Sequence, residues 1–170
     1  MPAEAPHVTI RTATAADADA ICEIYNHEVL NTTSTFDLVP RTVGVQRDWL
    51  AARSGAFAAI VAVDPATRRV VGFASLSPYK DRAAYATTVE DSIYIHRDFH
   101  GRGIGKQLLT HVIEAARVSG FHAVIARVEA SGAASRALHE SCGFELVGVE
   151  REVGRKFQKW LSVAVMQLLL

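Results

Sequence analysis

A glycine-rich segment, His100-Gly101-Arg102-Gly103-Ile104-Gly105-Lys106, joins an apolar strand-like stretch to an amphipathic helix and restricts the possible folds more than any other part of the sequence. The apolar stripe of that helix consists of Ile104, Leu108, Leu109, Val112, Ile113 and Ala116, and Gly120 ends it. Unpaired amides and the helix dipole at such a joint favour an anion. Glycines let the backbone approach a phosphate, and Arg102 and Lys106 add positive charge. The segment therefore predicts a pyrophosphate site, and a tight turn that merely starts the helix is the alternative.

Two other phosphate-binding motifs do not match this spacing. A P-loop has four residues between its first glycine and its Gly-Lys pair, followed by Ser or Thr, whereas this segment has three and continues with Gln107. A dinucleotide-binding fingerprint has the spacing Gly-x-Gly-x-x-Gly after the first strand of its domain, with an acidic residue about 20 positions later. Glu129 would supply the acidic residue, but the glycines follow Gly-x-Gly-x-Gly and come after several strands. The sequence therefore argues against both motifs.

The remaining sequence alternates between strand-like and helix-like stretches. Strands are expected at residues 8 to 11, 57 to 63, 70 to 76, 92 to 95 and 121 to 128 and in two closing segments. Helices are expected after the N-cap Thr14, after the N-cap Thr42 through about Ser54, and from Ile104. A last helix is expected over residues 133 to 142, where Ala134, Leu138 and Cys142 share one face. Residues 31 to 36 and 77 to 87 are polar, so both are expected to be loops, the second of them functional. The order βααββ, βαβ, αββ predicts a single α/β domain over residues 1 to 170, with a mixed sheet and helices on both faces.

Composition narrows the possible partners. The 18 basic and 18 acidic residues cancel, which argues against nucleic acid or an anionic membrane surface as a partner. The apolar run from Val163 to Leu170 is far shorter than the roughly 20 residues that cross a bilayer, and no signal segment is expected. Cys22 and Cys142 show neither a disulfide framework nor metal-site spacing, so no metal is expected. A cytoplasmic location follows as an expectation.

The glycine-rich segment resembles the phosphate loop of the GNAT acetyltransferase superfamily, which follows the fourth strand with the pattern Arg/Gln-x-x-Gly-x-Gly/Ala. His100-Gly-Arg-Gly103-Ile-Gly105 matches that pattern except at the first position. Over residues 8 to 167 the chain is similar to the phosphinothricin and methionine sulfone acetyltransferases of that superfamily. The matching stretches, in order, are Tyr25-Asn26-His27, Thr35-Phe36, Pro78 to Arg82, Tyr85, Thr88 to Ile95, Leu138-His139-Glu140 with Gly143-Phe144, and Lys156 with Trp160. Their shared order and spacing make the resemblance specific.

The resemblance implies the GNAT fold, a mixed and mostly antiparallel sheet of about seven strands flanked by helices on both faces. In that fold acetyl-CoA, the cosubstrate, binds in a V-shaped opening between the fourth and fifth strands, where its pantetheine arm adds to the sheet like a strand. The residues implied to contact the coenzyme are Ile93, Tyr94, Ile95, Gly101, Arg102, Gly103, Ile104, Gly105, Lys106 and Ser135. Because His100 lacks the charge of arginine, phosphate binding is expected to depend more on Arg102. Family members are commonly homodimers, so a homodimer to which the last strand contributes is expected.

Glu90 is the candidate general base. A protonated amine cannot attack a thioester, so a base must take its proton, directly or through a water. The alternation of its strand places Val89, Asp91, Ile93 and Ile95 on one face and Glu90, Ser92 and Tyr94 on the other. One carboxylate therefore occupies the middle of a sheet, where burial raises its pKa. The alternative is a strand-end carboxylate that faces water or pairs with Lys80 or Arg82.

His139 is the second catalytic candidate. It stands where many relatives carry a tyrosine near the last helix, which implies that it protonates the departing thiolate. The alternative is a helix-surface histidine bonded to Glu140 or to a backbone carbonyl. Cys142 is disfavoured as a covalent nucleophile because no His and Asn constellation accompanies it.

The polar loop supplies the candidates for substrate binding. Lys80 and Arg82 can clamp a carboxylate, phosphinate or sulfone oxygen, and Phe36, Tyr79 and Tyr85 can line the pocket; a solvated loop with packed aromatic rings is the alternative. We therefore expect direct acetyl transfer to the α-amine of a small amino acid or analogue, of the phosphinothricin, methionine sulfone or sulfoximine type. Two other hypotheses are a GNAT enzyme for another amine, such as a peptide N-terminus or a polyamine, and a non-catalytic acetyl-CoA-binding module.

Three positions depart from the family pattern. Relatives usually carry Asn, Gly and Asp where this chain has Gly132, Gln158 and Ser162. Gly132 lies three positions before Ser135, and glycine has no side chain for the coenzyme contact that the family's Asn implies. The sequence alone assigns no role to the other two departures.

Overall fold

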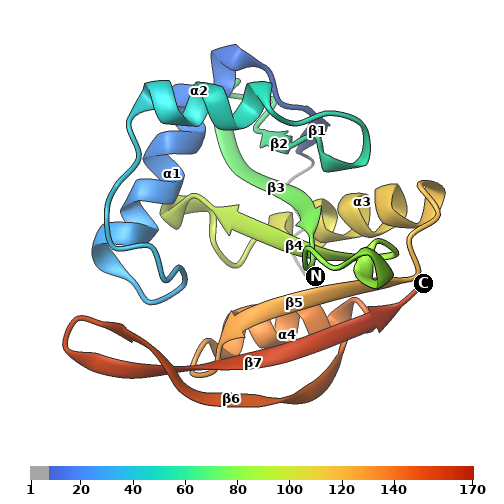
Figure 1. Ribbon diagram of the computed structural model, residues 1–170. Helices are drawn as coiled ribbons and strands as arrows, with labels where there is room; N and C mark the ends of the chain where they lie inside the picture. Colours follow the sequence, from blue (N-terminus) through green and yellow to red (C-terminus); the bar gives the residue numbers. More distant parts are fainter. Residues whose placement is uncertain (1–7) are drawn as a thin grey trace, which may run out of the picture.

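Seven β-strands form one twisted sheet in the structure, a computed structural model that describes residues 8–170 (Figure 1). The elements are β1 (Thr9–Thr12), α1 (Ala18–Asn31), α2 (Val43–Ala51), β2 (Ile60–Val63), β3 (Val70–Pro78), β4 (Thr88–Ile95), α3 (Ile104–Val118), β5 (Ala123–Glu129), α4 (Ala133–Ser141), β6 (Glu145–Lys156) and β7 (Lys159–Leu169). Short 3-10 turns lie at Ala15–Asp17, Gly55–Phe57, Ala83–Tyr85 and Arg97–Phe99. The order βααββ, βαβ, αββ predicted from the sequence is confirmed.

The sheet is mostly antiparallel and opens in the middle. Its order is β1-β2-β3-β4-β5-β7-β6, and β4 and β5 are the parallel pair. These two strands pair over three positions, the last being Glu90 with Ile125, and then separate. β4 continues to Ile95 and β5 to Glu129 without pairing to each other, and Figure 1 shows β5, β7 and β6 diverging from β4 toward the left of the view. The implied opening between the fourth and fifth strands is therefore present.

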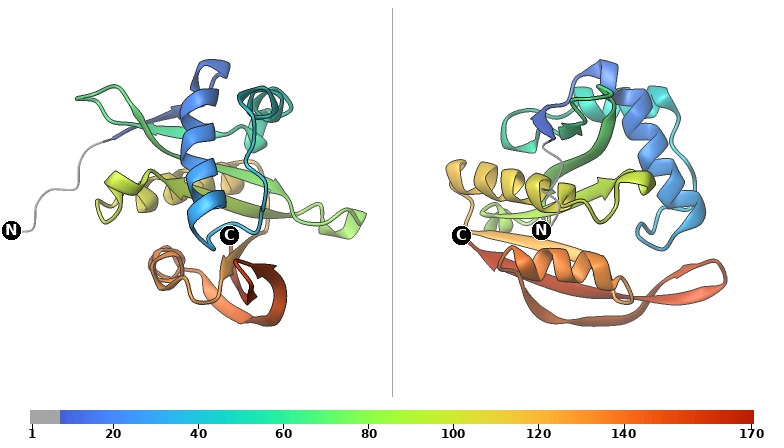
Figure 2. Two further views of the ribbon diagram at one scale, coloured as in Figure 1. Left: turned by 90° about the vertical axis from the view of Figure 1, so that its left-hand side faces the viewer. Right: turned by 180° about the vertical axis from the view of Figure 1, so that it is seen from behind.

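Helices cover both faces of the sheet. Seen from behind, α3 and α4 lie in front of the strands (Figure 2, right). The six stripe residues of α3 are all buried against the sheet, as the sequence predicts. On the other face α1 packs Ile21, Tyr25 and Val29 against Phe73 of β3. Alternation along β4 divides its side chains between these cores, with Val89 on the α3 side and Tyr94 on the α1 side.

Several predicted boundaries are wrong by a few residues. The second helix ends at Ala51 rather than Ser54, and the strand expected from residue 57 begins at Ile60. Between them Arg53 donates to the carbonyls of Phe57 and Leu76, which ties this segment to the 3-10 turn and to β3. The fourth strand begins at Thr88 rather than Ser92 because its first residues pair with β3 and β5 on both sides. The fifth strand spans Ala123–Glu129 rather than residues 121 to 128.

The last helix and the last strand also differ from expectation. Ala134 of α4 is exposed, and the buried residue of that helix is His139, whose side chain is held by a polar partner on β4. β7 does not form an edge, since it lies between β5 and β6 with Val163, Ala164 and Met166 buried. The edge on this side of the sheet is β6, and the other edge is β1. Within residues 8–170 no helix has the length and apolar character needed to span a membrane.

Candidate active site

The Glu90 carboxylate lies at the point where β4 and β5 separate. Its residue is paired with Ser77 of β3 and Ile125 of β5, and its side chain is partly buried on the α1 face. Within residues 8–170 it has no hydrogen bond or ion pair, so the predicted alternative of a pair with Lys80 or Arg82 is not present. Desolvation is the largest influence on this carboxyl and raises its pKa; Arg127 lowers the pKa, whereas Asp91 and Glu150 raise it. A partly buried carboxylate without a partner can accept a proton from a ligand.

The polar loop after β3 forms a hollow of about 570 Å³. Its lining consists of Tyr79, Lys80, Asp81, Arg82 and Tyr85. The two tyrosine rings meet edge to face at 5.6 Å, and the Lys80 ammonium lies 4.8 Å and 5.2 Å from their centroids. The stem of the loop is close to Glu90, because Ser77 is paired with Glu90 and Pro78, the residue before Tyr79, with Val89. The loop thus brings four of the five predicted substrate-binding residues together.

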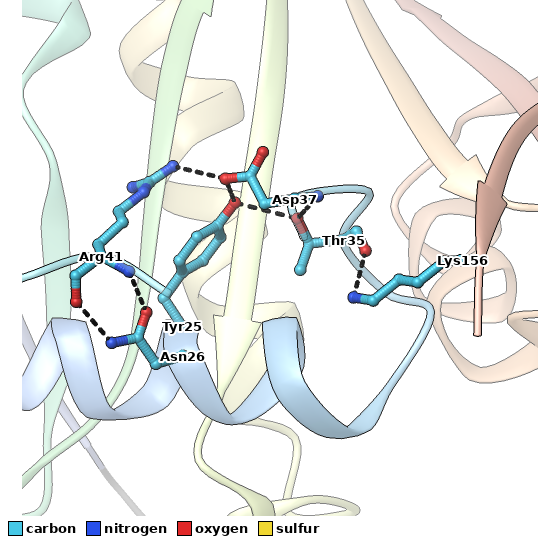
Figure 3. A network of polar contacts seen from close by, with 6 residues as sticks. All are labelled: Tyr25, Asn26, Thr35, Asp37, Arg41 and Lys156. Carbon is cyan, nitrogen blue, oxygen red and sulfur yellow. Dashed lines mark hydrogen bonds and ion pairs between the residues drawn. The ribbon is translucent and has the colours of Figure 1, made fainter. Parts of the chain in front are cut away.

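The segment between α1 and α2 is fixed to α1 by a polar network (Figure 3). The Tyr25 hydroxyl donates to Asp37 at 2.5 Å and lies 3.0 Å from the Thr35 hydroxyl. The Asn26 side chain donates to the Arg41 carbonyl and accepts from the Arg41 amide, each at 2.8 Å. The hydroxyl-rich stretch predicted as a loop over residues 31 to 36 is therefore a loop after Asn31, the last residue of α1, and Tyr25 holds it at Thr35.

The same segment is fixed to β6 by Lys156 and Phe36. The buried Lys156 ammonium donates to the carbonyls of Thr35 at 2.9 Å and Glu28 at 3.3 Å (Figure 3 shows the first bond). Desolvation lowers the pKa of Lys156, and the negative charges of Asp37 and Glu28 oppose that shift. Phe36 lies against the backbone of Gly154, where an added Cβ would be 2.6 Å from its Cδ2. Phe36, the fifth predicted substrate-binding residue, is thus placed by contacts with β6 rather than with the polar loop.

The predicted phosphate loop lies at the N-terminus of α3. Gly103 caps the helix in a left-handed conformation, with φ of 74°. The helix's hydrogen bonds begin with the Gln107 amide and the Gly103 carbonyl at 3.3 Å, so the amides of Ile104, Gly105 and Lys106 precede them and point along the helix axis. Ile104 itself is 1% exposed, which leaves its backbone for ligand contact.

The side chains around this loop have more specific positions than the sequence indicated. Arg102 donates to the Asp98 carbonyl at 2.9 Å and lies over the Phe99 ring, while Lys106 is exposed. Gly105 faces α4, where an added Cβ would be 3.0 Å from Leu138 Cδ2. The absence of a side chain at Gly105 therefore lets α3 and α4 pack closely, whereas the sequence suggested only that glycines let the backbone approach a phosphate.

The free edge of β4 carries the three strand residues predicted to bind coenzyme. Ile93, Tyr94 and Ile95 pair with β3 on one side and have no β5 partner on the other. The Tyr94 ring packs against Tyr25 and Phe73 on the α1 side, so its backbone rather than its ring faces the opening. The Ile95 carbonyl lies 2.9 Å from Nε2 of His100, which fixes the start of the phosphate loop to the end of the strand.

His139 lies on the opposite face of β4 from Glu90. The side chain is buried, with Nδ1 2.8 Å from the Ser135 carbonyl and Nε2 2.9 Å from Oδ2 of Asp91. Because both partners are acceptors, the ring donates from both nitrogens. Desolvation is the largest influence and lowers the pKa of His139, but the hydrogen bond and charge of Asp91 together with the Ser135 carbonyl raise it overall. The alternative prediction of a histidine on the helix surface is therefore wrong, because His139 is buried. The bond to a backbone carbonyl that it included is present, and Ser135 contributes that carbonyl.

The three positions that depart from the family pattern have separate surroundings. A Cβ at Gly132 would be 3.0 Å from the Glu129 carbonyl, so the start of α4 is closely packed. Phe157 and Gln158 both have positive φ in the two-residue turn between β6 and β7, as a type I′ turn requires. The Ser162 hydroxyl accepts the Glu152 amide at 3.0 Å where β6 bulges away from β7.

Two residues near Glu90 were not identified from the sequence: Arg127 and Glu150, which form an ion pair. The sequence also suggested no role for Asp91 or Lys156. Strand alternation placed Asp91 on the face opposite Glu90, which was a signal that it contacts other residues, here His139. Arg127 carried the same kind of signal, because it lies two residues beyond the partner of Glu90 in β5. Nothing local in the sequence indicated the partners of Glu150 or Lys156.

Comparison with known proteins agrees with this geometry. The model of the Acetyltransferase (GNAT) family matches residues 19–144. An L-methionine sulfoximine/L-methionine sulfone acetyltransferase of Pseudomonas paraeruginosa is 38% identical over 160 residues, 94% of this chain and 93% of that protein. A phosphinothricin N-acetyltransferase of Streptomyces coelicolor is 37% identical over 159 residues, 92% of this chain and 93% of that protein. The crystal structure of a phosphinothricin acetyltransferase from Sinorhizobium meliloti in complex with acetyl-CoA matches with a TM-score of 0.91 and 36% identity, over 96% of this chain and 88% of that one. With the split sheet and the glycine-rich start of α3, these matches show that the chain belongs to the GNAT acetyltransferase family.

Proposed function

We propose that the protein transfers an acetyl group from acetyl-CoA to the α-amine of a small amino acid or amino-acid analogue, with Glu90 as the general base. The observation that carries this proposal is the Glu90 carboxylate at the opening of the sheet, which has no partner among residues 8–170. Burial raises the pKa of Glu90, and a base works best when its pKa lies closer to the working pH. The amine would approach from the α1 face, since that is the face on which the carboxylate lies.

Acetyl-CoA fits two features of the chain. The edge of β4 beyond Glu90 lacks a strand partner, which suits a pantetheine arm that pairs like a strand. The amides of Ile104, Gly105 and Lys106 at the start of α3 suit a pyrophosphate, and Arg102 keeps further N–H groups for it besides the one bound to Asp98. When bound, acetyl-CoA supplies the activated acetyl group. Glu90 accepts the proton of the amine, directly or through a water.

The substrate class is supported by the printed activities of the relatives and by the charged loop. The two relatives above are named for methionine sulfoximine, methionine sulfone and phosphinothricin, all small amino-acid analogues. Lys80 and Arg82 provide cations for a carboxylate or an oxyanion of the substrate, and Tyr79 and Tyr85 flank them in the hollow. We propose Phe36 as a further wall, because its contact with Gly154 holds it beside β6.

His139 is proposed as the proton donor to the departing thiolate. It lies on the face of α3 and α4, the side on which the phosphate loop begins, and it carries a proton on each nitrogen. Donation requires one of these two hydrogen bonds to break. Loss of thiolate protonation in a His139→Gln variant, seen as a lower kcat without a change in acetyl-CoA affinity, would support the role.

The test is release of the CoA thiol across a panel of amines. Methionine sulfone, methionine sulfoximine and phosphinothricin should be turned over, and Glu90→Gln should abolish turnover. Activity with a peptide N-terminus or a polyamine instead would retain the enzyme and reject the substrate class. Acetyl-CoA binding by calorimetry without thiol release from any amine would favour the non-catalytic module.

Two further proposals concern assembly and location. We propose a homodimer formed through β6, because this edge strand exposes Leu146, Val147, Val149 and Val153. Light scattering gives the mass in solution, and a monomer would reject the proposal. A cytoplasmic location is supported by the free thiols of Cys22 and Cys142, and cell fractionation tests it.

A further inference from the structure

Arg127 and Glu150 form a bidentate ion pair that joins β5 to β6 across β7. Nη1 of Arg127 is 3.1 Å from Oε1 of Glu150, and Nη2 is 2.5 Å from Oε2. Arg127 is paired with Val165 and Glu150 with Val163 of the intervening strand, so the ion pair crosses β7 diagonally. Such a pair fixes the orientation of the guanidinium as well as its position.

Arg127 shares a face of the sheet with Glu90. Ile125 is the β5 partner of Glu90, and Arg127 lies two residues further along that strand, so both side chains project to the same side. The charge of Arg127 acts on the Glu90 carboxylate, yet its two Nη groups are bound to Glu150. The arrangement therefore directs a nearby guanidinium to a carboxylate other than the candidate base.

The charged groups around Glu90 show why it matters that Arg127 is bound to Glu150 rather than to Glu90. The titratable groups that influence Glu90 or the ion pair are Arg127, Glu150, Asp91, Lys80 and Tyr79, and the non-titratable Ser77 lies opposite Glu90 on β3. Arg127 is the cation in this set that acts on Glu90. A guanidinium bound to Glu90 would stabilise its charged form and occupy the lone pairs that must accept a proton, so the carboxylate would be a weaker base.

We infer that Glu150 is a positioning residue: by binding both Nη groups of Arg127, it keeps the guanidinium from pairing with Glu90 and leaves the Glu90 carboxylate available as a base. The inference deepens the proposed function and rests on it, since it concerns the strength of the same base. It assigns to Glu150, a residue of β6, a role that is exerted through Arg127.

A double-mutant cycle tests the inference through the titration of Glu90. The titration is followed in two ways, by the acidic limb of kcat/KM against pH and by the ¹³C shift of the Glu90 carboxyl, identified by its absence in Glu90→Gln. Glu150→Gln should move the titration to lower pH, so that on the acidic side kcat/KM, relative to its own plateau, rises about threefold or more. Arg127→Ala should move it to higher pH. In the Arg127→Ala background, the addition of Glu150→Gln should move the titration of Glu90 by a clearly smaller amount.

If Glu150→Gln moved the titration of Glu90 equally in wild type and in the Arg127→Ala variant, Glu150 would act through its own charge. This result would overturn the inference. The matched control is Glu145→Gln, which removes an exposed carboxylate from the same strand. A displacement by this control as large as that of Glu150→Gln would overturn the inference as well. Arg127→Lys keeps the charge without the fork and should lie between wild type and Glu150→Gln.

The carboxyl shift separates the inference from the proposed function because it needs no turnover. If no amine is acetylated but the shift follows the expected cycle, the proposed function fails and the placement of Arg127 by Glu150 stands. If Glu90→Gln abolishes turnover but the cycle is additive, the function stands and the inference fails.

Discussion

The side chains of His139 and Asp91 form a buried pair that fastens α4 to β4 on the face opposite Glu90, with Nε2 2.9 Å from Oδ2. The Ser135 carbonyl accepts from the other ring nitrogen. The Phe144 ring meets the imidazole edge to face at 5.0 Å and completes its enclosure. The pair thus links α4 to β4, one of the two strands that separate at the opening of the sheet.

The stability of this pair should depend on pH in a defined direction. The pKa of folded His139 is raised above its ordinary value, so the pair's full contribution is present below the unfolded pKa of about 6.5 and is lost as the pH rises through the folded pKa. Asp91→Asn should therefore lower the free energy of unfolding by about 3 kcal/mol near pH 6 and by less at alkaline pH. Urea unfolding across that range measures the difference.

The exposed His122 provides the control for this measurement. His122→Gln should leave the pH dependence of unfolding as in wild type. A loss of stability in Asp91→Asn that is the same at every pH would mean that His139 is neutral in the folded protein.

Glu90→Gln removes the proposed base while it keeps the size of the side chain. We expect kcat to fall by about 10²- to 10⁴-fold, with acetyl-CoA affinity changed by less than about twofold. In wild type, burial raises the pKa of Glu90, so activity should decline as the pH falls through that raised value and the base becomes protonated. Steady-state kinetics and calorimetry separate the two quantities, and comparable losses in turnover and coenzyme binding would assign Glu90 a structural role.

Gly154→Ala should disturb the substrate side of the site through Phe36. A Cβ at position 154 would be 2.6 Å from Phe36 Cδ2, so the ring, which is 38% exposed, must swing away from β6. We expect the KM for the amine to rise about 5- to 10-fold, equivalent to roughly 1 kcal/mol, with the KM for acetyl-CoA unchanged. In a Phe36→Ala background the same substitution should have little effect, because the clashing ring is gone. Equal effects in both backgrounds would place the disturbance in β6 itself.

Local patterns in the sequence were sufficient for the elements and for the faces of β4. The stripe of α3 has a period of 3.6 residues, and the alternation of β4 has a period of two, so Leu108 and Val89 could be placed in one core from the sequence. The partners of charged residues were not accessible in this way. Asp91 and His139 are 48 positions apart and Arg127 and Glu150 are 23 apart, and such pairs are set by how the elements pack. The sequence therefore placed Glu90 in the middle of the sheet but did not indicate which distant residues form these pairs.

Lys156→Met should loosen the segment between α1 and α2. The Lys156 ammonium is buried and donates to two backbone carbonyls, one of them, that of Glu28, in the last turn of α1, where the helix dipole favours a cation. Methionine fills a similar volume, and the Glu28 carbonyl keeps its bonds from the Thr32 amide and hydroxyl, but the Thr35 carbonyl loses this donor, at a cost of about 1 to 3 kcal/mol. Amide exchange in residues 32 to 42 should become faster, and the KM for the amine should rise while acetyl-CoA binding persists.

The exposed Lys159 is paired with Lys156 across the hairpin, so Lys159→Met is the matched control and should behave as wild type. Unchanged exchange in the Lys156 variant would mean that Tyr25 and Asn26 hold the segment without help from β6, because their bonds to Asp37 and Arg41 would then be sufficient.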